Sequence, residues 1–213
     1  MDDPKLARLL EHPAIWRGRS AARLEVLSSG FAALDESLPA GGWPRSGLIE
    51  ILVARFGSGE LSLLLPALAA LTSAASARWC VWVAPPLMPF APALAAQGIV
   101  LDRVAVVGGK RPLWAFEQVL GSGACDAALA WGNRPQPRDI RRLQLAAERG
   151  RTLGVLFRPR RAARQASVAV LRVGVESFHG GVRVTLLKGR GARGVVELPD
   201  LTAPLMAVSA GLA

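Results

Sequence analysis

The 213-residue chain contains no tyrosine, only two cysteines and only two histidines. Cys80 and Cys125 lie in apolar, strand-like runs, and no CxxC motif or Cys/His cluster accompanies them. This scarcity excludes a disulfide framework and a zinc site, so we expect two buried thiols and no metal. His12 and His179 stand apart from any Ser/His/Asp set or paired carboxylates, which argues against hydrolytic catalysis.

The chain also lacks a recognisable targeting segment. Its first residues, Met-Asp-Asp-Pro, are acidic and precede no apolar signal-peptide core. Residues 79–101 are uncharged and long enough to cross a bilayer, but prolines at positions 85, 86, 89 and 92 interrupt them. We therefore expect a soluble, cytoplasmic protein that does not bind a membrane.

Acidic residues are scarce in the second half of the chain. Residues 134–193 hold fifteen Lys and Arg against three acids, whereas residues 1–133 hold eleven basic and eleven acidic residues. A basic half indicates a polyanion or an acidic protein surface as partner. The alternative is a solvated arginine-rich face, and composition leaves both alternatives open.

What is present is a regular alternation of strands and helices. Unbroken apolar runs predict strands over 48–53, 78–84, 104–107, 127–131 and 153–157, with helices between them over 61–76, 89–97, 112–121 and 138–149. This alternation indicates an α/β fold, a mostly parallel sheet with helices on both faces. Strands over 168–175, 181–187 and 194–198 follow without helices, and we expect the last two to form an antiparallel edge near the C-terminus.

The turn after the first of these strands has the strand–loop–helix order of a phosphate-binding loop, whose consensus is G-x-x-x-x-G-K-[ST]. Gly57 and Gly59 are present, but Glu60 replaces the lysine and Leu61 replaces the hydroxyl that binds Mg²⁺. A triphosphate would meet a carboxylate instead of an ammonium, so we expect no nucleotide cofactor. We place Glu60 in the first turn of the following helix and interpret the loop as a structural turn.

The segments around this loop resemble the RecA family of recombinases. Residues 29–38, SGFAALDESL, and 41–51, GGWPRSGLIEI, are similar to the stretch that precedes the phosphate loop in that family. Residues 122–126, SGACD, resemble the stretch before its Walker B strand. The resemblance implies a RecA-like P-loop core.

The same resemblance implies that the catalytic positions are lost together. Pro86 stands at the position of the glutamate that activates water, Trp131 at the Walker B aspartate, and Pro159 near the glutamine that senses the γ-phosphate. Each replacement removes a carboxylate or amide that ATP hydrolysis requires. Together with the two changes in the loop, this predicts a degenerate pseudo-ATPase and not an enzyme.

Among RecA-like proteins without these residues, the chain resembles the ImuA family over residues 24–200. The shared motifs are GGWPR (41–45), GSGEL (57–61), VAPP (83–86), LWAFEQ (113–118), RRLQLAAE (141–148) and LFRP (156–159). The resemblance implies a non-catalytic accessory protein in SOS-induced translesion DNA synthesis and DNA repair, which bridges an ImuB-like polymerase homologue and RecA or RecA–DNA. Two alternatives stay open: a weak RecA-type DNA-dependent ATPase, and a SulA-like SOS inhibitor of cell division.

Basic side chains are the candidates for contact with DNA or a protein partner. The segment 158–164 lies where RecA keeps a DNA-contacting loop, and no aromatic residue interleaves its arginines for base stacking. The candidate contact residues are Arg141, Arg142, Arg158, Arg160, Arg161, Arg164, Lys188 and Arg190.

Residues 1–23 are predicted to form an N-terminal helix and linker, residues 24–200 the RecA-like domain, and residues 201–213 a frayed tail. By analogy with RecA filaments, the apolar face of the N-terminal helix would dock on RecA or on a second copy of the chain through Leu6, Leu9, Leu10 and Trp16. Docking without a functional ATP interface would then shorten a RecA filament. Of the other tryptophans, we expect Trp79, Trp82, Trp114 and Trp131 in the core and Trp43 at the surface.

Overall fold

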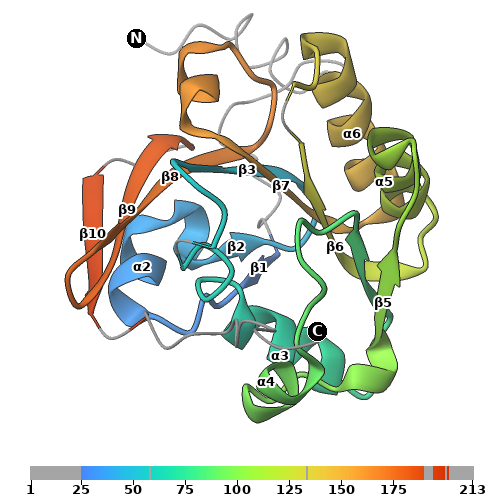
Figure 1. The fold of residues 1–213 in the computed structure, drawn as a ribbon, viewed down its shortest axis with the longest axis horizontal. Helices are drawn as coiled ribbons and strands as arrows, with labels where there is room; N and C mark the ends of the chain where they lie inside the picture. The colour runs from blue at the N-terminus through green and yellow to red at the C-terminus, as the bar shows by residue number, and fades with distance from the viewer. Residues whose placement is uncertain (1–24, 58, 133, 190–193, 200, 202–213) are drawn as a thin grey trace, which may run out of the picture.

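The structure is a computed structural model that describes residues 25–57, 59–132, 134–189, 194–199 and 201. Its main sheet consists of eight strands: β3 (Gly47–Val53), β4 (Trp79–Val83), β5 (Val104–Val107), β6 (Cys125–Trp131), β7 (Leu153–Pro159), β8 (Leu171–Phe178), β9 (Gly181–Lys188) and β10 (Gly194–Pro199). The strand order is β10-β9-β8-β3-β7-β6-β4-β5 (Figure 1). A separate antiparallel pair joins β1 (Val26–Leu27) to β2 (Trp43–Pro44).

The helices that accompany the sheet are short. They are α2 (Ala32–Ser37), α3 (Leu65–Ser73), α4 (Ala91–Ala96), α5 (Pro112–Gly121) and α6 (Pro137–Gly150), with 3₁₀ turns η1 (Pro39–Gly41), η2 (Leu101–Arg103) and η3 (Arg160–Arg164). Four of the five α-helices have a proline in their first turn, where a missing N–H costs no intrahelical hydrogen bond; these are α3, α4, α5 and α6.

The sheet is mixed and mostly parallel, as the apolar strand pattern predicted. β3 pairs in parallel with β7 and β8, and β4 pairs in parallel with β5 and β6. β9 runs antiparallel to β8, and β10 runs antiparallel to β9 at the edge. The predicted antiparallel edge near the C-terminus is therefore confirmed.

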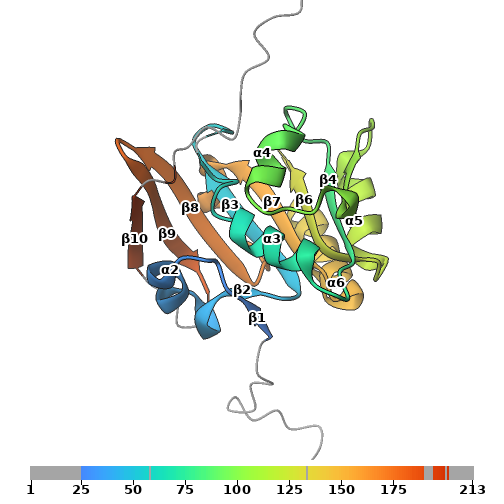
Figure 2. The same ribbon diagram turned by 90° about the horizontal axis from the view of Figure 1, so that it is seen from below.

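Helices cover both faces of this sheet, with α3 and α4 on one side and α5 and α6 on the other (Figures 1 and 2). Because side chains alternate along a strand, Ile49 and Ile51 of β3 join the core cluster that includes the apolar residues of α3. Leu48 of the same strand joins the cluster under α5 and α6. β3 is buried along its whole length, which explains why its sequence is apolar except for Glu50.

Two predicted elements begin three or more residues later than expected and also end three residues away from their predicted ends. The helix predicted from residue 61 begins at Leu65, because residues 59–64 form turns instead. Glu60 therefore does not lie in a first helical turn. The strand predicted from residue 168 begins at Leu171, and residues 168–170 belong to no strand.

Tryptophan burial also differs from the prediction. Trp43 is fully buried, because the β1–β2 pair turns it into the core beside α2 and α3. Trp79 and Trp114 are exposed: Trp79 is the first residue of β4, and Trp114 lies on the outer face of α5, with Arg111 5.3 Å from its ring centre. Trp82 is buried as predicted, and Trp131 is half-buried.

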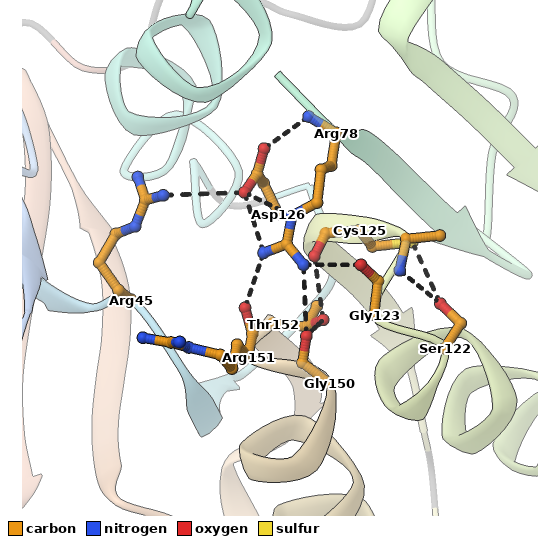
Figure 3. Close-up of polar contacts among 10 residues, drawn as sticks. Arg45, Arg78, Ser122, Gly123, Cys125, Asp126, Gly150, Arg151 and Thr152 are labelled. Carbon is orange, nitrogen blue, oxygen red and sulfur yellow. Dashed lines mark hydrogen bonds and ion pairs between the residues drawn. The ribbon is translucent and has the colours of Figure 1, made fainter. Parts of the chain in front are cut away.

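The SGACD motif has a structural role at the amino end of the sheet (Figure 3). Asp126 accepts hydrogen bonds from the backbone N–H of Arg78 at 2.7 Å and from its Nε at 3.1 Å. The same guanidinium donates to the carbonyl oxygens of Gly123, Gly150 and Arg151. Arg78 thus ties the starts of β4 and β6 to the end of α6 and satisfies carbonyl groups that the helix leaves without intrahelical partners.

Among the residues that the structure describes, no helix is long and apolar enough to cross a membrane.

Candidate functional site

The candidate site lies at the carboxyl end of β3, where residues 54–57 and 59–60 follow the strand. β3 sits between β7 and β8, which both come from later in the chain. β3 is therefore a topological switch point of the sheet. Open α/β sheets commonly bind their ligands at such a point, outside the carboxyl ends of the strands. A nucleotide-binding protein of this class would hold its phosphates here.

The loop's own carboxylate occupies the inside of this turn. Gly57 and Gly59 both have positive φ, near +85°, which curls the loop. The Gly57 N–H donates a 2.7 Å hydrogen bond to Oε1 of Glu60, and Glu60 is only 3% exposed. A backbone N–H that a phosphate-binding loop would offer to its ligand is therefore satisfied by an internal anion.

Leu61, which stands at the position of the magnesium-binding hydroxyl, packs against the core cluster beside α3. It offers no oxygen to a metal, and Glu60 next to it is turned toward the loop backbone. In the described part of the chain, no group of three or more His, Cys, Asp or Glu side chains could hold a metal ion.

An aromatic stack surrounds Trp131, the residue that the sequence resemblance assigns to the Walker B position. Trp131 at the end of β6 stacks on Phe157 of β7, with ring centres 4.8 Å apart and planes 20° apart. Trp82 of β4 follows at 5.9 Å in a tilted arrangement. These three rings come from adjacent strands and belong to the core under α3, so they provide packing and no group that could orient water.

A buried ion cluster lies on the opposite face of the sheet and shares only β7 with the aromatic stack. Oε1 of Glu50 accepts a 2.5 Å hydrogen bond from Arg158, and its Oε2 accepts a 2.5 Å hydrogen bond from Arg172. All three side chains are almost completely buried, and they come from β3, β7 and β8. The prediction that Arg158 contacts DNA or a partner is wrong, because its guanidinium is buried and forms an ion pair with Glu50.

The two buried arginines also hold the arginine-rich segment in place. Arg158 donates to Oε1 of Gln165 at 2.7 Å, and Arg172 donates to the carbonyl oxygens of Ala162 and Gln165 at 2.7 and 3.0 Å. The segment 160–165 is therefore anchored over β3 by buried charge.

The remaining candidate contact residues lie at the surface, and several are already paired. Arg160 forms an ion pair with Glu176, and Arg142 forms a two-pronged pair with Glu117. Lys188 donates 2.7 Å hydrogen bonds to the carbonyl oxygens of Ser167 and Ala169. Partial burial and the charge of Arg172 lower the pKa of Lys188, against the opposing influence of Glu50. Arg141, Arg161 and Arg164 are exposed.

Several predicted residues lie outside the described part of the chain: Leu6, Leu9, Leu10, Trp16, His12, Arg190 and the tail after residue 201. Their predicted roles stay predictions. His179 is exposed in the turn between β8 and β9. Burial raises the pKa of the Cys80 thiol to about 12, as expected for a buried structural cysteine.

Sequence reasoning missed Glu50, Arg172, Arg55 and Arg134. Glu50 and Arg172 interrupt otherwise apolar strands, and a single charge in such a run was the available signal that two strands share a buried ion pair. Arg55 and Arg134 each follow the end of a parallel strand, and strand topology alone brings such positions to one edge.

Comparison with known proteins gives sequence relatives but no matching family model. Over 120 residues the chain is 31% identical to the cell division inhibitor SulA of Photorhabdus laumondii, a match that covers 55% of this chain and 67% of that protein. Over 119 residues it is 31% identical to the cell division inhibitor SulA of Edwardsiella piscicida, covering 54% and 70%.

A crystal structure of SulA from Pseudomonas aeruginosa aligns with a TM-score of 0.45 at 23% identity, over 52% of this chain and 97% of that one. The narrower resemblance to ImuA stays a prediction. The two sequence matches each span two thirds or more of the relative, and on that basis the chain belongs to the SulA family.

Proposed function

We propose that this chain is a non-catalytic inhibitor of cell division that acts by binding a protein of the division machinery, of the tubulin-like class, as part of the SOS response. The observation that carries the non-catalytic part is the hydrogen bond from the Gly57 N–H to the buried Glu60 carboxylate. A phosphate at this loop would have to displace a charged partner and then face its repulsion. The relatives, whose names describe cell division inhibitors, support the division partner.

An exposed apolar run supports a role in protein binding. Leu87, Met88 and Phe90 follow β4 at the carboxyl edge of the sheet, and they are 59%, 77% and 47% exposed. Three large apolar side chains exposed within four residues are costly in a monomer and typical of a contact surface. Methionine and phenylalanine are also enriched at the cores of protein interfaces. We place the principal partner contact on this run.

The test is polymer sedimentation of a tubulin-like division protein in the presence of the purified chain. We expect the wild-type chain to reduce the polymer fraction, and we expect the double variant Met88→Ser, Phe90→Ser to lose at least about tenfold in potency, since two interface anchors are removed. The matched control is Leu145→Ser, Val195→Ser, which removes exposed apolar side chains from α6 and β10. Unchanged polymers with the wild-type chain would refute the division partner.

A second candidate function is the ImuA-like accessory role in translesion synthesis. The observation that favours it is coverage: the motif resemblance extends over residues 24–200, whereas each sequence match to a cell division inhibitor covers about half of the chain. Its partners would be an ImuB-like polymerase homologue and RecA. Capture of the ImuB-like protein by the immobilised chain, without any effect on division-protein polymers, would favour this function over the first.

A further inference from the structure

Three arginines converge on one pocket beside the loop that follows β3. The pocket has a volume of about 420 Å³ and is lined by Arg55, Arg134 and Arg161, with Val53, Phe56 and Pro159 as apolar wall. Each arginine follows the carboxyl end of a different strand, in the chain order β3, β6 and β7. These strands are neighbours in the sheet and run parallel, so their ends deliver the three side chains to the same edge. We call this site the arginine pocket.

Among the residues that the structure describes, the lining of the arginine pocket includes no carboxylate. Glu60 of the adjacent loop is turned inward onto the Gly57 N–H. Arg134 and Arg161 are exposed, and neither takes part in a hydrogen bond or ion pair with any residue that the structure describes. The guanidinium groups of Arg134 and Arg161 therefore have donors available to an anionic ligand.

The surroundings favour a local acidic group over a long polyanion. Arg160, next to Arg161 in the chain, is paired with Glu176, so an acidic residue interrupts the basic surface here. A nucleic-acid strand binds through many consecutive phosphate contacts and, for single strands, through aromatic stacking platforms. An apolar wall beside guanidinium groups instead suits a short peptide in which carboxylates lie next to an apolar side chain.

We propose that the arginine pocket binds an acidic segment of a protein partner. The carboxylates accept hydrogen bonds from Arg134 and Arg161, and an adjacent apolar side chain packs on the wall of Phe56 and Pro159. This inference rests on the proposed function only in that the segment would belong to the division protein. It adds an electrostatic contact, distinct from the exposed apolar run, to that interaction.

The test uses the full chain and fluorescein-labelled poly-glutamate, followed by fluorescence anisotropy. We expect saturable binding that weakens at least about tenfold in the double variant Arg134→Gln, Arg161→Gln, because two charge-assisted contacts are lost. The matched control is Arg142→Gln, Arg183→Gln, which removes the same charge from exposed arginines that are already ion-paired. If both variants weaken poly-glutamate binding equally, the effect comes from net charge alone and the proposal is overturned.

Two further arms separate the outcomes. Tighter binding of a labelled single-stranded oligonucleotide through Arg134 and Arg161 would assign the pocket to nucleic acid and overturn the proposal. Wild-type binding of poly-glutamate, lost in the pocket variant, without binding of the division protein would keep the pocket and refute the proposed function. If the pocket variant binds the division protein as well as the wild-type chain does, the proposed role of the pocket is refuted and the proposed function stands.

Discussion

Replacing Glu50 with glutamine tests how much of the stability depends on the buried ion cluster. The substitution keeps the shape of the side chain and leaves Arg158 and Arg172, 2% and 6% exposed, without a counter-charge. Removing one partner of a buried pair costs about 3–5 kcal/mol, because the remaining charge stays desolvated. For a chain of this size, that corresponds to a fall in Tm of about 6–20 °C.

The assay is thermal and urea unfolding of Glu50→Gln followed by circular dichroism. The control is Glu197→Gln, which breaks an ion pair whose two side chains are 44% and 52% exposed, and which should cost less than about 1 kcal/mol. Replacing all three members of the cluster with apolar residues of similar volume should recover most of the loss. A cost below about 1 kcal/mol for Glu50→Gln would refute the reasoning.

The other predictions concern the aromatic stack, the thiols and the Arg78 contacts. Trp131→Asp should cost about 2–4 kcal/mol of unfolding free energy in urea without creating ATPase activity, since it opens an aromatic stack; measurable turnover would contradict the pseudo-ATPase account. Burial raises the pKa values of Cys80 and Cys125, so neither thiol should react with a disulfide reagent at pH 8 until the chain unfolds; rapid modification of the native protein would show that they are accessible. Arg78→Met should cost about 2–3 kcal/mol in the same urea assay, because several carbonyl groups and a carboxylate lose their donor, and a loss under about 0.5 kcal/mol would show that water replaces it.

The fold was largely predictable because most of its strands are predominantly apolar. The strand Val104–Val107 and the helix Pro112–Gly121 have the predicted bounds, and the parallel order followed from the alternation of strands and helices. The start of α3 was not predictable from apolar periodicity, since Leu61 and Leu64 have the i, i+3 spacing of a helix but lie in the turns that follow Glu60.

The sequence predicted only those features of the site that depend on residues close together in the chain. The loss of the lysine and hydroxyl in the phosphate loop can be seen in the sequence at Glu60 and Leu61. The burial of Arg158 cannot, because the carboxylate that neutralises it lies 108 residues away in the chain. Within the cluster of basic residues at 158–164, sequence alone does not distinguish a buried arginine from an exposed one such as Arg161.

The central claim is that the Glu60 carboxylate closes the loop after β3, so that this loop binds no nucleotide. Isothermal titration of the purified chain with Mg·ATP tests it most directly, with a hydrolysis assay on the same sample. We predict no saturable heat up to millimolar nucleotide and no phosphate release. Micromolar binding with turnover that is abolished by Glu60→Gln or Trp131→Ala would contradict the account.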